Sequence, residues 1–163
     1  LGLQNEGIVA TPKHFAVYSI PVGGRDGGTR TDPHVAPREM KTLYLEPFRK
    51  GIQEAGALGV MSSYNDYDGE PVSGSYHFLT EILRQQWGFK GYVVSDSEAV
   101  EFLHTKHRIT PTEEEMAAQV VISARTSLRH RILFFHCAVL LVRAKSLCIR
   151  SINVLVRFSV SSL

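Results

Sequence analysis

The sequence is poor in cysteine and has no long apolar segment. Its two cysteines, Cys137 and Cys148, are too few for the disulfide framework of a small secreted domain. Neither has a companion at the spacing of a zinc site. The longest apolar run, 132–142, is interrupted by His136 and is shorter than the about 20 residues that cross a bilayer as a helix. The sequence therefore gives no reason to expect a disulfide scaffold, a metal or a membrane span.

The last forty residues lack several residue types altogether. Ala124–Leu163 contains no Asp, Glu, Gly or Pro, but it has seven basic residues. The preceding part holds all 13 Gly, all 7 Pro and all 16 acidic residues, which gives it a net charge of −5. The composition changes abruptly near Ser123. We therefore treat 1–123 as one unit and 124–163 as an atypical basic and apolar tail.

The whole chain has 163 residues, which is enough for one domain with a sizeable core. Apolar residues make up 44% of it, an ordinary value for a globular protein. It begins with Leu1 rather than Met and has no basic segment followed by an apolar one. We expect the true start to be missing or removed, so the sequence does not indicate a cellular compartment.

Strand and helix patterns alternate along the first unit. Strands are predicted over Ile8–Phe15, Gly59–Asn65 and Tyr92–Val94, and helices over Pro37–Ala55, Tyr76–Trp87 and Thr112–Ser123. The segment 66–75 between them is rich in turn residues and is predicted to be a loop. The alternating order is typical of parallel βα units, so the predicted fold class is α/β.

The predicted helices carry start and stop signals. Pro37 suits a first helical position, Pro47 should kink the helix, and Gly56 should end it. Its apolar face is predicted to contain Met40, Leu43, Tyr44, Phe48 and Ile52. In the last helix, Thr112 and Glu115 have the spacing of a capping box.

All three predicted strands end in polar residues. These are Lys13-His14, Ser63-Tyr64-Asn65 and Ser95-Asp96. Because parallel strands present their carboxyl ends on one rim, these side chains should converge there and form an active site. Asp96 stands out because it follows Tyr92–Val94, an apolar run predicted to be covered on both faces. Its alternative role is to cap the next helix, with its carboxylate accepting a backbone N–H near Glu98.

The segment 16–34 is a glycine-rich loop that is too long for a plain connection, so it is either functional or mobile. Its two Gly-Gly pairs do not form the G-x-G-x-x-G pattern that opens a helix in a dinucleotide site. Nothing in the sequence indicates a metal, a nucleotide cofactor or a nucleic-acid partner.

Several motifs together resemble a known family. In order they are K-H-F at Lys13–Phe15, P-R-E at Pro37–Glu39, L-E-P-F at Leu45–Phe48, V-M-S-S-Y-N at Val60–Asn65, L-R-Q-Q-W-G-F-K-G at Leu83–Gly91 and V-V-S-D at Val93–Asp96. The unit 1–123 resembles the N-terminal catalytic barrel of glycoside hydrolase family 3, which contains β-glucosidases and β-xylosidases. The resemblance implies part of a (β/α)₈ TIM-type barrel, with a separate sandwich domain expected in the full-length protein.

The resemblance also implies a site. Asp96 would be the nucleophile of a retaining β-glycosidase that acts on terminal β-glucosyl or β-xylosyl residues. Lys13 and His14 would hold sugar hydroxyls, Tyr64 would lie beside the nucleophile, and Arg30 in the glycine-rich loop would help to bind the sugar. A nearby Lys13 ammonium would also lower the pKa of the nucleophile. No cofactor is implied.

The second carboxyl group of such an enzyme is not identified. In many family members the acid/base comes from a later domain, and Glu98 is too close to Asp96 in sequence to face it across a substrate. A family branch that acts on N-acetylglucosaminides uses a histidine within an Asp-x-His group, which Asp32-Pro33-His34 matches superficially. This chain reads A-V-Y-S after K-H-F where that branch has Pro-Gly-His-Gly. A β-N-acetylglucosaminidase is therefore a minor alternative.

Two other interpretations stay open. A complete barrel needs about 250 residues, so the matched part covers roughly half of one. We expect the isolated chain to be inactive and prone to aggregate, and a truncated remnant or a non-catalytic sugar-binding module is the alternative function.

For the tail, the hypothesis is a shifted reading frame, because some codon choices for Cys148–Ser162 allow a neighbouring frame that resembles the helix closing this family's barrel. The competing interpretation is a basic arm for a membrane or nucleic acid, but the apolar stretches Ile132–Phe135 and Ala138–Val142 argue against a simple solvated arm, and neither partner is expected.

Overall fold

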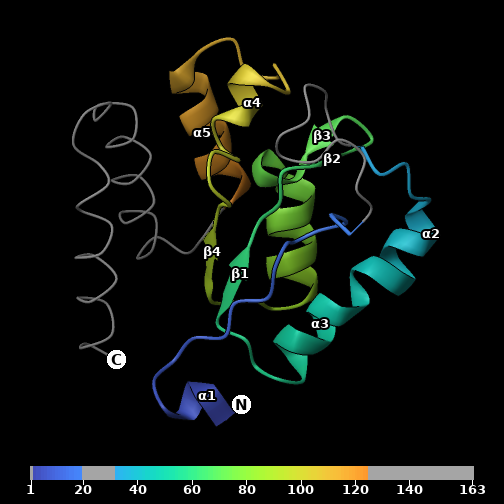
Figure 1. Ribbon diagram of the computed structural model, residues 1–163, viewed down its shortest axis with the longest axis vertical. Coiled ribbons are helices and arrows are strands. Elements are labelled where there is room, and N and C mark those ends of the chain that lie inside the picture. The colour runs from blue at the N-terminus through green and yellow to red at the C-terminus, as the bar shows by residue number, and fades with distance from the viewer. Residues whose placement is uncertain (1, 20–31, 125–163) are drawn as a thin grey trace.

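The computed structural model describes residues 2–19 and 32–124 (Figure 1). Arg30 and the tail from residue 125 onward therefore lie outside the described residues. The helical elements are α1 (Gly2–Asn5), α2 (Pro37–Glu39), η1 (Met40–Tyr44), α3 (Glu46–Gln53), η2 (Val72–Gly74), η3 (His77–Gln86), α4 (Phe102–Thr105) and α5 (Glu113–Ser123). The strands are β1 (Gly59–Met61), β2 (Asp66–Tyr67), β3 (Glu70–Pro71) and β4 (Tyr92–Val94).

The central sheet is parallel, as the alternating sequence pattern predicts. In β1 and β4, Val60 lies opposite Val93. On the other side of β1, the Phe15 N–H donates to the Met61 carbonyl at 2.8 Å, and Phe15 forms a parallel bridge with Ser62. The predicted strand Ile8–Phe15 is thus an extended segment joined to β1 by this bridge and by two further hydrogen bonds, from the Gly59 and Met61 N–H groups to the Ala10 and Pro12 carbonyls. The segment 8–15 is the first of three parallel neighbours, with β1 in the middle.

Only one face of β4 is buried among the described residues. Val93 is 5% exposed, whereas Tyr92 and Val94 are 45% and 38% exposed. The prediction that both faces of Tyr92–Val94 are covered is therefore wrong for the described part of the chain. The physical reason is that the helices pack on the side of Val60 and Val93, and successive side chains of a strand point to opposite faces.

Phe15 fixes the end of the first segment against the helical layer. Its side chain is fully buried, and its ring packs edge-on against Phe48, Phe78 and Trp87. Each such aromatic pair contributes about 0.5–1.5 kcal/mol beyond the burial of area. Because neighbouring side chains alternate, anchoring Phe15 on the helix side directs His14 toward the opposite face of the sheet.

The predicted helix 37–55 is irregular. At η1 the Leu45 N–H donates to the Met40 carbonyl at 2.9 Å, which is a bond to the fifth preceding residue rather than the fourth. This wider turn changes the helical register, so Leu43 is 58% exposed and Leu45 is buried in its place. Pro47 lies at the start of α3 instead of kinking a continuous helix. The helix ends before Gly56, whose φ of 66° confirms the predicted stop.

The remaining elements agree with the sequence in part. The predicted helix Tyr76–Trp87 is confirmed as η3, and its buried residues include Phe78, Leu79, Ile82 and Leu83. The predicted cap of α5 is also present, since the Glu115 N–H donates to the Thr112 hydroxyl at 3.2 Å. The segment 66–75, predicted to be a plain loop, contains the β2–β3 hairpin and η2. The short helix α4 was not predicted.

The elements are arranged so that the two ends of the sheet differ (Figure 1). α1 lies near the ends where the strands begin, whereas α4, α5 and the hairpin lie toward the carboxyl ends. In a parallel α/β layout the carboxyl ends are where functional side chains gather. Within the described ranges, no helix is both long and apolar enough to span a membrane.

Candidate active site

The polar ends of the first and third strands meet in space. The His14 Nε2 lies 3.2 Å from the Asp96 Oδ2, although the two residues are far apart in the sequence. The side chains are 28% and 17% exposed, so both are partly shielded but reachable from solvent. The predicted convergence of these strand ends is therefore present for His14 and Asp96. An imidazole beside a carboxylate offers both a hydrogen-bond donor and a nucleophilic oxygen.

Asp96 is held by a tight turn directly after β4. Its Oδ1 accepts a hydrogen bond from the Ser97 N–H at 2.8 Å, and its own carbonyl accepts from the Ala99 N–H at 3.1 Å. Glu98 has a φ of 65°, which makes the turn sharp. The alternative that Asp96 caps the next helix is wrong, because its carboxylate accepts from the Ser97 N–H within this turn and α4 begins only at Phe102. The other oxygen faces His14, so the carboxylate occupies a fixed position at the strand end.

Tyr64 belongs to a row of rings that leads to His14. Its side chain is 7% exposed, and its ring centroid lies 5.8 Å from that of Tyr18 and 5.6 Å from that of Phe102. The Tyr18 ring in turn packs edge-on against His14 at 5.5 Å. Tyr64 is therefore linked to the His14–Asp96 pair through Tyr18.

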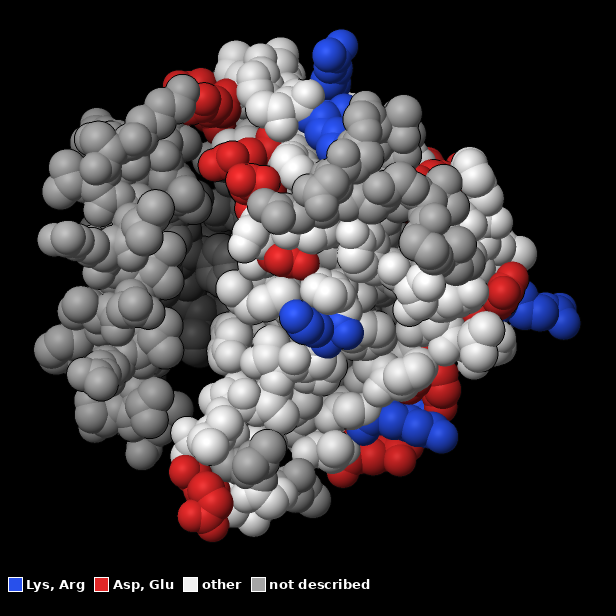
Figure 2. Space-filling model, viewed as in Figure 1, with Lys and Arg blue, Asp and Glu red and all other residues white. Residues whose placement is uncertain are grey.

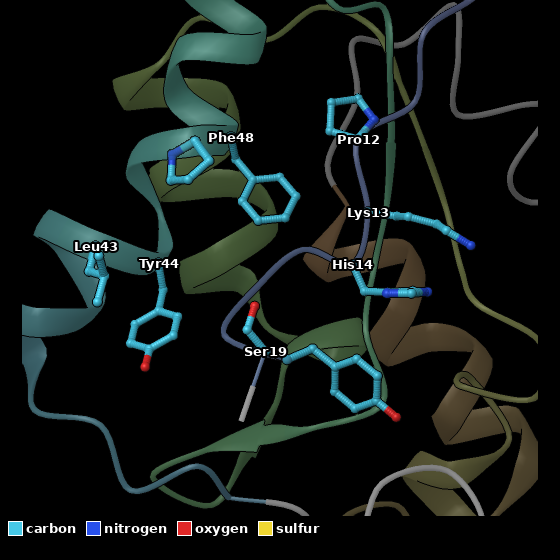
Figure 3. Close-up of a pocket in the computed structure, with 9 residues that line it drawn as sticks. Pro12, Lys13, His14, Ser19, Leu43, Tyr44 and Phe48 are labelled. Carbon is cyan, nitrogen blue, oxygen red and sulfur yellow. The ribbon is translucent and has the colours of Figure 1, made fainter. Parts of the chain in front are cut away.

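Lys13 is placed differently from His14. It is exposed, and among the described residues it forms no ion pair. Its suggested effect on the pKa of Asp96 stays a prediction. Figure 3 shows the Lys13 and His14 side chains extending away from the Tyr44 and Phe48 rings. A cleft of ≈ 570 Å³ lies beside these residues. It is lined by Pro12, Lys13, His14, Tyr18, Ser19, Leu43, Tyr44, Pro47 and Phe48.

The Asp32-Pro33-His34 group forms a local pair of its own. The His34 N–H donates to the Asp32 Oδ1 at 2.8 Å, and the His34 Nδ1 lies 3.7 Å from the same oxygen. The His34 side chain is 82% exposed. Because Asp32 and His34 are two residues apart, these contacts are those of a local turn, which follows the glycine-rich loop in the sequence. Arg30, the remaining predicted site residue, lies outside the described residues.

Charge on the described surface is mixed. Figure 2 shows acidic side chains gathered over the region of α4 and α5, while basic ones lie scattered on the same face. The clearest pKa shift of a partly buried base is at Arg84, whose pKa is lowered by burial. Its Nη1 donates to the Phe89 and Gly91 carbonyls at 3.4 and 3.2 Å. Arg84 therefore shapes the turn that leads into β4 rather than the site itself.

Sequence reasoning missed three residues around Tyr64: Tyr18, Phe102 and His107. Tyr18 lies in the loop after K-H-F, where only its aromatic character was a signal. Phe102 and His107 lie in and just after α4, which had no clear helical pattern. His107 is buried, and its Nε2 lies 3.0 Å from the Tyr64 carbonyl. Nothing in the order of the residues indicates that contact, because it joins positions 43 residues apart.

Comparison with known proteins identifies the family of the chain. The profile of the glycosyl hydrolase family 3 N terminal domain matches residues 1–125. A β-xylosidase of Formosa agariphila is 35% identical over 124 residues, covering 71% of this chain and 17% of that protein. A β-glucosidase of Rhizobium radiobacter is 37% identical over 95 residues, covering 58% of this chain and 11% of that protein.

The chain is also similar in structure to solved β-glucosidases. A β-glucosidase from Erythrobacter marinus superposes with a TM-score of 0.66 and 34% identity, over 83% of this chain and 18% of that one. The chain thus spans less than a fifth of the length of each of these three relatives. The match with the family profile extends through residue 125, so it includes the segments that carry His14, Tyr64 and Asp96.

Proposed function

The chain belongs to glycosyl hydrolase family 3, and on that premise we propose that it is part of the catalytic domain of a retaining β-glycosidase. The substrate would be a glycoside with a terminal, non-reducing β-glucosyl or β-xylosyl residue. The observation that carries the proposal is the His14–Asp96 pair, 3.2 Å apart at the carboxyl ends of parallel strands. Relatives named β-xylosidase and β-glucosidase support both sugars equally.

The proposed chemistry starts at the Asp96 carboxylate. One of its oxygens attacks the anomeric carbon as the bond to the leaving oxygen breaks, and a glycosyl ester forms. Water then cleaves the ester and restores the carboxylate, which gives overall retention of configuration. Asp96 suits this role because its Oδ1 is held by the Ser97 N–H while Oδ2 lies on the His14 side. A nucleophile needs this kind of rigid placement.

His14, Lys13 and Tyr64 would position the sugar, and Arg30 would assist from the glycine-rich loop. His14 can donate a hydrogen bond to a sugar hydroxyl in either charge state. Tyr18, which was not predicted, packs between His14 and Tyr64 and would support both. The acid that protonates the leaving oxygen is expected from another part of the protein. Glu98 is exposed on the turn after Asp96 and is not assigned this role.

The proposal includes a larger fold. The segment 8–15, β1 and β4 would be three adjacent strands of a (β/α)₈ barrel, and further strands would cover the exposed side chains of Tyr92 and Val94. A sandwich domain would complete the site. Alternatively, the chain is an inactive remnant or a sugar-binding module, and a β-N-acetylglucosaminidase is a minor alternative.

The test is hydrolysis of aryl β-glucosides and β-xylosides by the full-length product of the gene, with the first-formed sugar anomer followed by NMR. Release of the β-anomer first is the expected result. Release of the α-anomer first would contradict retention. Binding of the sugars without hydrolysis would favour the sugar-binding module, and a second panel of N-acetylglucosaminides tests the remaining alternative.

A further inference from the structure

His107 reaches from the segment after α4 to the backbone of Tyr64, which lies just beyond β1. Its side chain is buried, with 6% of the residue exposed. Its Nε2 lies 3.0 Å from the backbone carbonyl oxygen of Tyr64. A carbonyl oxygen can only accept a hydrogen bond, so the Nε2 must carry a proton and donate it. This imidazole therefore ties the Tyr64 backbone to a distant segment of the chain.

Local hydrogen bonds turn His107 inward. Its own N–H donates to the Phe102 carbonyl at 2.7 Å, and the Ile109 N–H donates to the Leu103 carbonyl at 2.9 Å. Between them, Arg108 has a φ of 56°, which reverses the chain sharply. The orientation of the imidazole is thus set by the closed turn around it and by the Tyr64 carbonyl.

The same segment also holds the Tyr64 ring. Phe102 packs against that ring with a centroid separation of 5.6 Å. The Lys106 Nζ lies over the Phe102 ring, 5.0 Å from its centroid. Tyr64 is consequently held at its backbone by His107 and at its ring by Phe102, and both contacts come from residues 102–107.

This segment continues directly from the turn that carries Asp96. The Phe102 N–H donates to the Glu98 carbonyl at 3.0 Å, so α4 is built onto the Asp96 turn. From Tyr64, the Tyr18 ring leads to His14, which faces Asp96. The support of Tyr64 and the placement of Asp96 therefore share one structural unit.

We propose that His107 is a positioning residue that fixes Tyr64, and through Tyr18 the His14 side chain, relative to Asp96. The inference rests on the proposed glycosidase function for its catalytic consequence. Its structural part, the placement of Tyr64, stands independently of any activity.

The structural part is tested by ¹⁹F NMR of the full-length gene product labelled with 3-fluorotyrosine, with the Tyr64 signal assigned from Tyr64→Phe. His107→Leu removes the donor at similar volume, and it should shift or broaden the Tyr64 signal. His107→Gln keeps an amide N–H donor and should restore it, whereas the shorter amide of His107→Asn should not. An unchanged Tyr64 signal in folded His107→Leu or His107→Asn would overturn the proposal.

His104 provides a matched control in the same segment. Its Nδ1 lies 2.8 Å from the Thr110 carbonyl, so it too binds a backbone oxygen, but within its own turn. His104→Gln should leave the Tyr64 signal in place. A Tyr64 shift of equal size in this variant would mean that general loosening of the segment, and not the His107 contact, is being observed, and it would overturn the proposal.

The catalytic part is tested by the rate at which a 2-deoxy-2-fluoro glycoside labels the enzyme. Because a misplacement of about 1 Å can cost about 100-fold in rate, His107→Leu should lower the labelling rate constant by roughly 10-fold or more. His107→Gln should recover most of it. A purely structural role would reduce only the fraction of enzyme labelled, and that result would contradict positioning. A shifted Tyr64 signal in His107→Leu, together with a wild-type protein that is neither labelled nor able to hydrolyse glycosides, would support the positioning and overturn the glycosidase proposal instead.

Discussion

Two side-chain contacts bridge the outer strands of the sheet, one at each end of β1, and they are built from different residues. Toward the amino ends, the Thr11 hydroxyl lies 2.9 Å from the Tyr92 hydroxyl. Toward the carboxyl ends, the His14 imidazole lies 3.2 Å from the Asp96 carboxylate. Both pairs join the first segment to β4 or the turn after it.

The two contacts differ in chemistry, and this difference suggests that one affects stability and the other affects activity. The hydroxyl pair is neutral and crosses directly over Gly59, where an added Cβ would lie 2.8 Å from the Tyr92 hydroxyl and still closer to the Thr11 hydroxyl. Such a pair can align strands but offers no ionisable group near neutral pH. The histidine–carboxylate pair can exchange protons and attack carbon. One end of the sheet should therefore set stability, and the other should set activity.

The largest expected effect is at Asp96. Asp96→Asn keeps an oxygen that can accept the Ser97 N–H but removes the nucleophile. Loss of a nucleophile typically costs about 10³-fold or more in kcat, so hydrolysis of aryl glycosides should nearly vanish. Stability in thermal unfolding should change little. Activity within tenfold of wild type would contradict the catalytic role assigned to the end of the sheet that carries Asp96.

A smaller loss is expected at His14. His14→Leu removes the imidazole beside Asp96 that is proposed to donate a hydrogen bond to a sugar hydroxyl, and one such bond is worth about 0.5–1.5 kcal/mol, or roughly a 2–10-fold fall in kcat/KM. His77→Gln is the control, because His77 pairs with Glu81 on the surface of η3. Equal losses in the two variants would show that the His14 effect is not specific to the site.

At the other end, Gly59→Ala should destabilise the protein without a specific change in chemistry. The new methyl group would overlap the Thr11–Tyr92 contact, and overpacking of this kind costs typically about 1–3 kcal/mol. The matched control is Gly51→Ala in α3, where the Cβ would meet only the Pro12 side chain at 3.6 Å. There, the higher helix propensity of alanine should stabilise by about 0.5–1 kcal/mol. Urea unfolding distinguishes the two, and equal destabilisation would contradict the assigned role of Gly59.

The smallest expected effect is at Tyr92. Tyr92→Phe removes the hydroxyl contact to Thr11 but keeps the ring, and one hydrogen bond contributes about 0.5–1.5 kcal/mol. Because this contact is exposed, the lower part of that range is expected in urea unfolding. kcat/KM should be unchanged. A loss of activity in this variant without a loss of stability would contradict the claim that the Thr11–Tyr92 contact acts on stability alone.

Much of the fold was predictable because its signals are local. Val60 and Val93 lie in short apolar runs, Gly56 stops a helix, and Thr112 caps one, and each needs only its neighbours in sequence. The register change at η1 was not predictable from the same pattern, since a single wide turn exposes Leu43 while the apolar spacing is unchanged.

The candidate site divides in the same way. The meeting of His14 and Asp96 was predictable because polar residues follow parallel strands, and that order fixes the rim on which they meet. Tyr18 and His107 were not, because each is placed by contacts with Tyr64 that span long sequence separations. A ring in a loop and a histidine after a short helix give no periodic signal that would reveal such contacts.

The measurement that tests the central claim most directly is peptide mapping by mass spectrometry of the full-length gene product after reaction with a 2-deoxy-2-fluoro-β-glucoside or β-xyloside that carries an activated leaving group. We expect a single glycosyl label on Asp96 that is absent from Asp96→Asn, and the reagent that reacts faster identifies the preferred sugar. Labelling of a different carboxylate, or efficient hydrolysis by the Asp96→Asn variant, would contradict it.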